Sequence, residues 1–123
     1  MDMKLYHAHL YFQSQDIDKV KALETLARVS SLFHEIEIYS SPVGPHPLPT
    51  LELHFYENNY LAAKGWLELN QGGYSILIHE ETGDDVRDHS ENIEWLGEPV
   101  PIDFGFFDLI LKRPDLRIHP VKS

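Results

Sequence analysis

The sequence predicts an α+β fold in which two helices cover one face of a single antiparallel sheet. Three observations predict it: four short stretches alternate apolar and polar residues, two longer stretches repeat apolar residues at helical spacing, and their order is β-α-β-β-α-β. Elements in this order fit the ferredoxin-like sandwich, a split β-α-β unit with strand order 4-1-3-2. With 123 residues, the chain is expected to form one domain over residues 1–123, including a C-terminal extension.

The expected elements are bounded by capping and turn residues as well as by periodicity. Asp16 and Asn59 are typical N-cap residues, and Gly72 with Gly73 is expected to end the second helix. The predicted elements are a strand at residues 4–12, a helix at 16–31, strands at 33–39 and 50–56, a helix at 59–70, a strand at 74–79 and a short helix at 90–96. The side chains expected to face the helices are Tyr6, Ala8, Leu10, Phe12, Ile36, Ile38, Leu51, Leu53, Phe55, Tyr74, Ile76 and Ile78.

The opposite rows of the same strands fall on the face that the helices leave uncovered. They carry His7 and His9 on the first strand, Glu52 and His54 on the third, and His79 on the fourth. Since the first strand is expected between the other two and antiparallel to both, neighbouring Cβ atoms should lie roughly 5 Å apart. Each piece alone is more typical of solvated polar surface, but five such residues on one face favour a site.

Imidazole and carboxylate groups without sulfur are typical ligands of a divalent metal ion. Two histidines and one carboxylate with open positions bind Fe(II) in non-haem oxygenases. Zn(II) accepts the same ligands in hydrolytic sites. The residue types therefore predict a metal site on this face and leave both ions open.

Residues 40–49 are predicted to form a stiff loop around a histidine. Pro42, Pro45, Pro47 and Pro49 fix four φ angles, and His46 lies between two of these prolines. A hairpin connection with an incidental histidine is an equal alternative. Because the loop leaves the third strand at the end away from the cluster, His46 must fold across the uncovered face, or reach a second subunit, to join it. An uncovered face also predicts a homodimer.

Composition excludes several classes of protein. The formal net charge of -10 disfavours nucleic acid and anionic membranes as partners. No apolar run approaches the roughly 20 residues of a membrane span. Cysteine is absent, which excludes disulfides, thiol nucleophiles and sulfur ligands and fits a cytoplasmic location. Eight histidines in 123 residues are the unusual feature.

Five short motifs follow one another between His7 and Gly97. They are His-Ala-His-Leu-Tyr-Phe at 7–12, Pro-Val-Gly-Pro-His-Pro at 42–47, Leu-Ile-His at 77–79, Thr-Gly-Asp-Asp at 82–85 with Asp-His at 88–89, and Trp-Leu-Gly at 95–97. In this order they resemble the DOPA 4,5-dioxygenase family of ring-cleaving extradiol enzymes. Glu80 departs from the proline expected after the histidine of the fourth strand, and the tail after Gly97 matches no motif.

The resemblance implies a non-haem Fe(II) enzyme that opens the ring of a catechol, such as DOPA, with O2. It implies His9, His46 and His79 as the leading metal-site residues, with His7 the fourth; Glu52 and His54 are candidates from strand alternation alone. His7 or His89 is expected to act as acid or base, and Asp88 to orient a base or a metal ligand unless it only caps a turn. A zinc hydrolase on the same ligands, and a non-catalytic module that binds a metal or a small aromatic ligand, stay open as alternatives.

Overall fold

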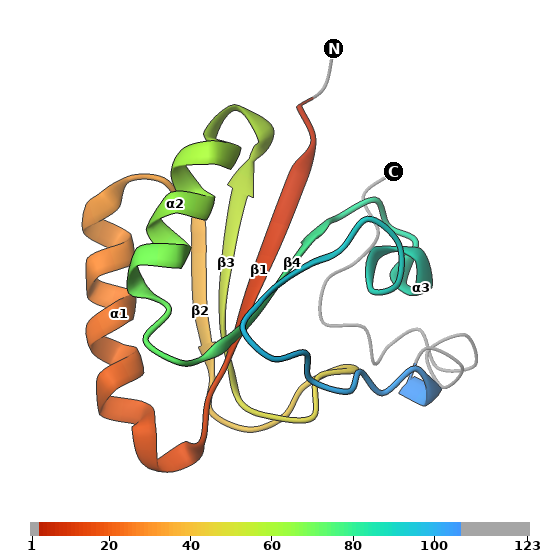
Figure 1. The fold of residues 1–123 in the computed structure, drawn as a ribbon, viewed down its shortest axis with the longest axis horizontal. Helices are drawn as coiled ribbons and strands as arrows, with labels where there is room; N and C mark the ends of the chain where they lie inside the picture. Colours follow the sequence, from red (N-terminus) through yellow and green to blue (C-terminus); the bar gives the residue numbers. More distant parts are fainter. Residues whose placement is uncertain (1–2, 107–123) are drawn as a thin grey trace.

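The computed structural model describes residues 3–106 as one open antiparallel sheet with two long helices (Figure 1). Most of the expected C-terminal extension lies outside these residues. The elements are β1 (Leu5–Tyr11), η1 (Ser14–Asp16), α1 (Ile17–Ser30), β2 (Glu35–Tyr39), β3 (Thr50–Tyr56), η2 (Glu57–Asn59), α2 (Tyr60–Asn70), β4 (Ser75–Glu80), α3 (Asp85–Asp88) and β5 (Glu94–Leu96). The strand order is β2-β3-β1-β4-β5. The predicted α+β class and the order 4-1-3-2 are confirmed, with β5 added beside β4.

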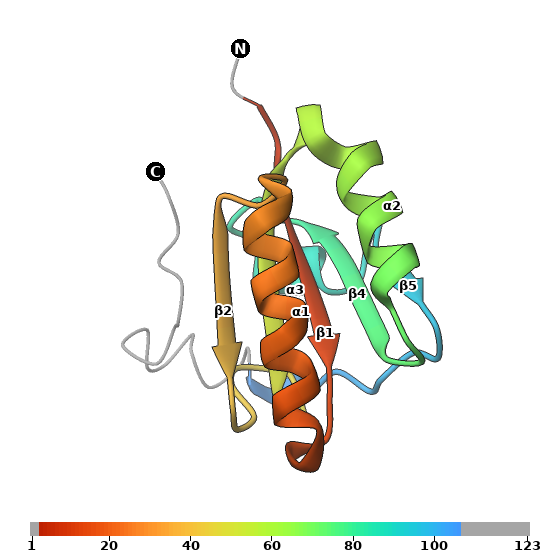
Figure 2. The same ribbon diagram turned by 90° about the vertical axis from the view of Figure 1, so that its left-hand side faces the viewer.

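Both helices pack on the same face of the sheet, as Figure 2 shows with α1 and α2 in front of the strands. Val20 and Ala27 of α1 and Ala63 and Leu67 of α2 are buried there. Burying each larger apolar side chain contributes about 1.5–3 kcal/mol to folding. All the strand residues predicted to face the helices belong to this core or pack against it.

The two predicted N-caps hold the right positions but do not act through their side chains. Asp16 and Asn59 are the N-cap residues of α1 and α2, and neither side chain caps its helix. A short 3-10 turn precedes each helix and continues into it. The Asn59 amide instead donates to the Leu32 carbonyl at 3.2 Å and ties α2 to the loop before β2.

The segment after β4 differs from the prediction. The helix expected at residues 90–96 is wrong: the helix lies earlier, at α3, where the Asp84 carboxylate accepts from the Arg87 amide at 3.2 Å. Residues 94–96 form β5 and pair antiparallel with residues 76–78 of β4. Because β4 would otherwise expose a row of unpaired N–H and C=O groups, pairing with β5 prevails over the local helical tendency.

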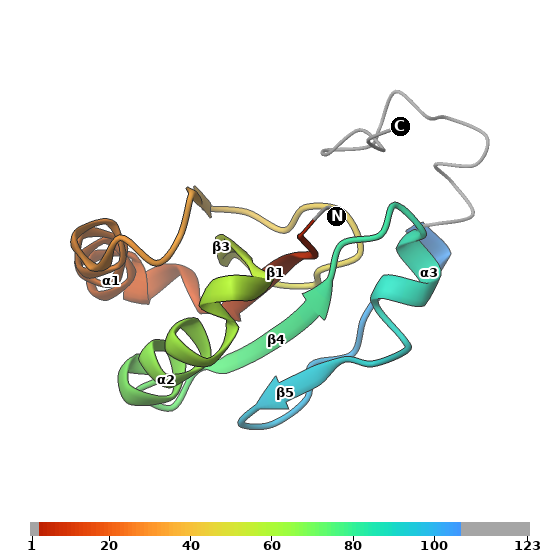
Figure 3. The ribbon, with the colours of Figure 1, turned by 90° about the horizontal axis from the view of Figure 1, so that it is seen from above.

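The sequence predicted an open face opposite α1 and α2, but in the structure this face is covered. Seen from above in Figure 3, the proline loop and α3 lie on the side of the sheet away from the helices. The Asp103 amide donates to the Pro45 carbonyl at 2.8 Å and holds the loop. The five residues predicted for the site on this face, His7, His9, Glu52, His54 and His79, are at most 4% exposed, so the single chain buries the part of the face that was expected to invite a dimer.

Candidate metal centre

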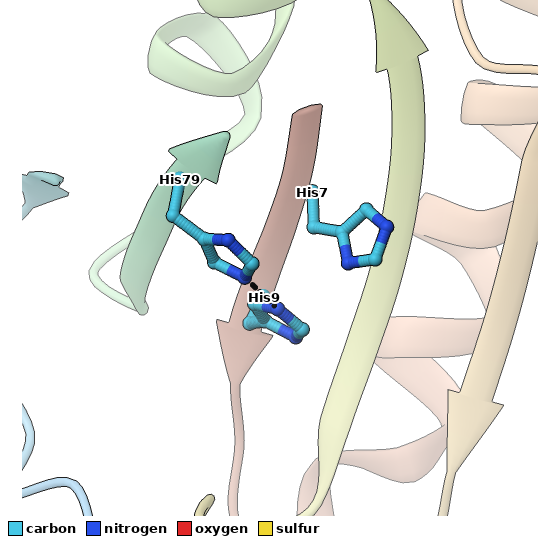
Figure 4. Close-up of side chains that lie close together, drawn as sticks. All are labelled: His7, His9 and His79. Atoms are coloured by element: carbon cyan, nitrogen blue, oxygen red, sulfur yellow. Dashed lines mark hydrogen bonds between the residues drawn. The ribbon is translucent and has the colours of Figure 1, made fainter. Parts of the chain in front are cut away.

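The pairing of β1 with β4 brings His7, His9 and His79 together (Figure 4). The Nε2 atoms of His9 and His79 are 2.9 Å apart, and the two rings are nearly parallel. At a metal–nitrogen distance of about 2.1 Å, two histidine nitrogens lie about 3.4 Å apart on a tetrahedral ion and about 3.0 Å apart at neighbouring positions of an octahedral ion. The observed separation therefore suits an N–H···N hydrogen bond or a shared ion of octahedral geometry better than a tetrahedral zinc ion.

His46 and His89 reach the same place from loops. The proline loop turns at Gly44, whose φ of 57° favours glycine, and places the His46 ring 4.1 Å from the His9 ring. His89 follows α3, and its ring lies 4.4 Å from that of His79. Ligand atoms of His9, His46 and His89 lie within 4.8 Å of one another. His46 thus joins the cluster within one chain, by folding across the sheet.

Backbone carbonyls fix which nitrogen two of these histidines offer. His79 Nδ1 donates to the Glu80 carbonyl at 3.0 Å, and His89 Nδ1 donates to the Asp85 carbonyl at 2.8 Å. A carbonyl only accepts, so Nδ1 carries the proton, and each neutral ring offers the lone pair of Nε2. For His79 this lone pair points at His9 Nε2.

The surroundings of His9 favour a bound cation. In the absence of an ion, His9 Nε2 must donate to His79, which leaves the His9 Nδ1 lone pair facing the Glu52 carboxylate at 3.8 Å. Within the described residues this buried Nδ1 has no hydrogen bond, which is costly. A metal ion on His9 Nε2 would move the proton to Nδ1, where it faces Glu52. The donor set therefore fits a divalent ion.

Burial keeps the imidazoles of His9, His79 and His89 neutral near pH 7. It holds the pKa of His9 well below its usual value, and the neighbouring His46 and His79 lower it further. Burial also lowers the pKa of His79 to about 3 and that of His89 to about 4. Since a metal ion binds the neutral form of imidazole, protons would compete weakly with it.

A second group of ligands lies on the β3 side of the same face. His54 lies between two carboxylates: its Nε2 is hydrogen-bonded to Glu52 at 2.6 Å, and its Nδ1 lies 3.0 Å from a Glu35 oxygen. Its ring stacks on His7 with centroids 3.8 Å apart. His7 Nδ1 lies 3.4 Å from a Glu81 oxygen. His7, Glu52 and His54 also have a spacing that could hold a metal ion.

The buried carboxylate of Asp88 closes the turn before α3. It accepts the Thr82 amide at 2.8 Å and the Thr82 hydroxyl at 2.6 Å, one on each oxygen. Asp88 thereby fixes the segment that carries His89. The sequence placed Asp88 beside His89 but did not indicate Thr82 as its partner.

Tyr11 shares the row of His7 and His9 on β1 and is a further residue of the site. Its hydroxyl lies 2.7 Å from His46 Nδ1, and its ring stacks on Trp95 of β5. Burial, with help from Glu52, raises the pKa of Tyr11, so the phenol keeps its proton. Only the path of the proline loop reveals this contact.

The described part of the chain contains no helix long and apolar enough to cross a membrane.

A family model described as the Dopa 4,5-dioxygenase family matches residues 6–106.

Two curated proteins and one crystal structure are similar to the chain. An "Uncharacterized 21.2 kDa protein" of Botryotinia fuckeliana is 32% identical over 81% of this chain and 61% of its own length. A "DOPA 4,5-dioxygenase" of Amanita muscaria is 28% identical over 95% of this chain and 58% of its own. The chain thus spans about three fifths of these relatives. The crystal structure of a proposed dioxygenase from Nostoc punctiforme aligns with a TM-score of 0.73 at 31% identity, over 88% of this chain and 94% of that one.

Proposed function

Because the chain belongs to the Dopa 4,5-dioxygenase family, we propose that it is an extradiol dioxygenase that opens the ring of a catechol with O2 at a non-haem Fe(II) site. The family and the structural relative support a dioxygenase. The observation that supports a metal-dependent reaction is the buried histidine group, in which the Nε2 atoms of His9 and His79 lie 2.9 Å apart and ligand atoms of His46 and His89 lie within 4.8 Å of one of His9. The substrate class and Fe(II) come from the family, and Zn(II) on the same ligands is the alternative, because imidazole suits both ions.

We assign His9, His46 and His79 as the residues that would hold the ion, with His9 as the ring common to two groups of suitable spacing, His7–His9–His79 and His9–His46–His89. His79 offers Nε2 because Glu80 holds its Nδ1, and His9 gains a partner at Nδ1 only when its Nε2 is ligated. Glu52 would then orient His9 through that second nitrogen, as carboxylates commonly do for metal-bound histidines. The alternative position for the ion is the His7, Glu52 and His54 group.

When bound, Fe(II) would supply a template for the catechol oxygens and a route for electrons between the ring and O2. The protein residues exclude water and move protons. His7 is the better placed base, since the carboxylates of Glu81 and Glu52, both within 4 Å of its Nδ1, would stabilise its cationic form. His89, held at Nδ1 by the Asp85 carbonyl, can exchange a proton at Nε2.

The test is anaerobic reconstitution with Fe(II), followed by O2 uptake and absorbance scans with a panel of catechols. We expect about one iron per chain, a yellow ring-cleavage product and one O2 consumed per product. The variant His79→Ala should lose most of the iron, whereas His34→Ala should keep it, because His34 stacks on Tyr56 away from the converging Nε2 atoms. Full iron and activity in His79→Ala would refute the assigned site.

A second variant, Glu52→Gln, tests whether Glu52 is itself a metal ligand, without changing the packing around it. Glu52→Gln has nearly the same shape as the native side chain. It should weaken metal binding about 10–100-fold if Glu52 only orients His9, and abolish it if Glu52 is a ligand. Iron binding without turnover would support a metal-binding module, and hydrolysis with Zn(II) would support the hydrolase.

A homodimer and a cytoplasmic location stay predictions. Because the single chain buries the histidines, the proposed site needs no residue from a second copy. Sedimentation velocity of the iron-loaded protein measures the oligomeric state directly.

A further inference from the structure

We propose that Tyr11 is a positioning residue for His46. Its hydrogen bond to His46 Nδ1 turns Nε2 of that ring toward the metal ion, and its hydroxyl can change from donor to acceptor when the ion binds. The inference rests on the proposed function, because it takes His46 as a ligand. It concerns a β1 residue that the proposed chemistry does not use.

The contact joins a rigid element to a loop. Tyr11 is the last residue of β1, paired with Thr50 on one side and Ser75 on the other, and its ring stacks on Trp95. Tyr11 is 3% exposed and His46 6% exposed, so water does not compete for their 2.7 Å hydrogen bond. The sheet thereby holds the imidazole of a loop that has no regular secondary structure.

Proton counting gives this hydrogen bond two possible directions. A neutral imidazole has one N–H and one lone pair, and a phenol both donates and accepts. If Tyr11 donates to His46 Nδ1, then Nε2 carries the proton and cannot bind a metal ion. If His46 Nδ1 donates to the Tyr11 oxygen, then Nε2 offers its lone pair. Tyr11 can therefore keep its hydrogen bond to His46 Nδ1 both in the metal-free protein, as donor, and in the metal-bound protein, as acceptor.

His46 differs in this respect from His79 and His89. Their Nδ1 atoms donate to backbone carbonyls, which only accept, so their neutral rings offer the Nε2 lone pair whether or not an ion is bound. His46 alone of these three has a partner that can reverse the direction of the hydrogen bond. Metal binding at His46 is therefore accompanied by rotation of the Tyr11 O–H away from the imidazole.

The experiment removes one oxygen atom. Tyr11→Phe keeps the ring that stacks on Trp95 but can neither donate to His46 nor accept from it. Tyr39→Phe is the matched control: Tyr39 pairs with Thr50 from the other side, and burial, with Glu52, also raises the pKa of this tyrosine, to about 12. Affinity is measured with Zn(II), which avoids oxidation, by competition with a chromophoric chelator.

We expect Tyr11→Phe to bind Zn(II) about 10–100-fold more weakly and Tyr39→Phe to bind like the wild type. In a His46→Ala background, Tyr11→Phe should cause no further loss, which a general effect on folding would not reproduce. The ring nitrogens of His46 in the metal-free protein, followed by NMR, should show a different balance of the two tautomers in Tyr11→Phe than in the wild type.

Each failure has its own signature. Wild-type affinity in Tyr11→Phe, or equal losses in both phenylalanine variants, would overturn the inference and leave the proposed function standing. A wild-type protein that binds neither Fe(II) nor Zn(II) would overturn the proposed function. In that case unchanged His46 ring signals in Tyr11→Phe would also reject the Tyr11 contact.

Discussion

The histidines of the proposed site differ in the group that contacts their Nδ1 atom. Backbone carbonyls hold His79 and His89, the Tyr11 phenol holds His46, and the Glu52 carboxylate lies opposite His9 Nδ1 at 3.8 Å. These partners set the tautomer and therefore the chemistry of each ring. At the residue scale, the site depends on these four contacts as much as on the imidazoles.

Thr50 provides a test of stability next to the site. It is completely buried, and its hydroxyl has no hydrogen bond within the described residues. Because a buried hydroxyl without a partner costs about 1–3 kcal/mol, Thr50→Val should raise the free energy of unfolding by about 1 kcal/mol. Urea unfolding measures the change.

The matched control for Thr50→Val is Thr82→Val. Thr82 donates its hydroxyl to Asp88, so the same substitution should destabilise the protein there. A loss of stability in Thr50→Val would mean that its hydroxyl has a partner after all.

At the element scale, strands and loops supply the site in different ways. β1 and β4 place His7, His9 and His79 by register, with His7 directly opposite His79. The proline loop and the α3 segment place His46 and His89 by docking onto the sheet. Strand positions are therefore insensitive to single substitutions in the loops, whereas His46 and His89 depend on the contacts that anchor their segments.

The Asp88–Thr82 contact is the anchor that can be removed most cleanly. Asp88→Ala leaves the Thr82 amide and hydroxyl without their acceptor, so we expect a loss of about 2–3 kcal/mol in the free energy of unfolding. Weaker Zn(II) binding should accompany it, because His89 is displaced. Urea unfolding and chelator competition measure both effects.

Two other substitutions calibrate the effect of Asp88→Ala. Asp88→Asn keeps one acceptor oxygen, so its free energy of unfolding should lie between those of Asp88→Ala and the wild type. Asp84→Ala removes only the exposed cap of α3 and should cost less than about 1 kcal/mol. An Asp88→Ala protein as stable as the wild type would contradict this account of the turn.

For the whole molecule, the buried histidines predict acid sensitivity of the metal-free protein. Their pKa values in the folded state, about 3 for His79, about 4 for His89 and well below 6.5 for His9, are lower than in the unfolded chain. The unfolded state therefore binds protons first as the pH falls. Stability is complete above about pH 6.5 and decreases toward the folded-state values, by up to about 1.4 kcal/mol per pH unit for each histidine.

Urea unfolding of the metal-free protein between pH 7.5 and 5 measures this dependence, above the range where most carboxylates titrate. His89→Asn should reduce the slope if the protein still folds. A free energy of unfolding that does not change across this range would show that the histidines are not neutral in the folded state.

The strand rows and most of the candidate site could be predicted because the alternation of a strand is local. In β1 and β3, residues two positions apart lie on the same face of the sheet, so the face of each residue can be read from its neighbours. The ends predicted for β3 are those observed. The same alternation placed His7, His9, Glu52, His54 and His79 on one face, where the structure has them.

The tertiary structure decided that this face is buried and how His46 and His89 reach it, which strand alternation could not predict. Prolines fix φ angles in the loop at residues 40–49 but not where the loop docks, which depends on contacts such as the one between Asp103 and Pro45. β5 forms only because β4 offers an unpaired edge, a feature that no local window contains. Local periodicity thus determined the sheet and its histidine rows, whereas contacts between residues distant in the sequence closed the site over them.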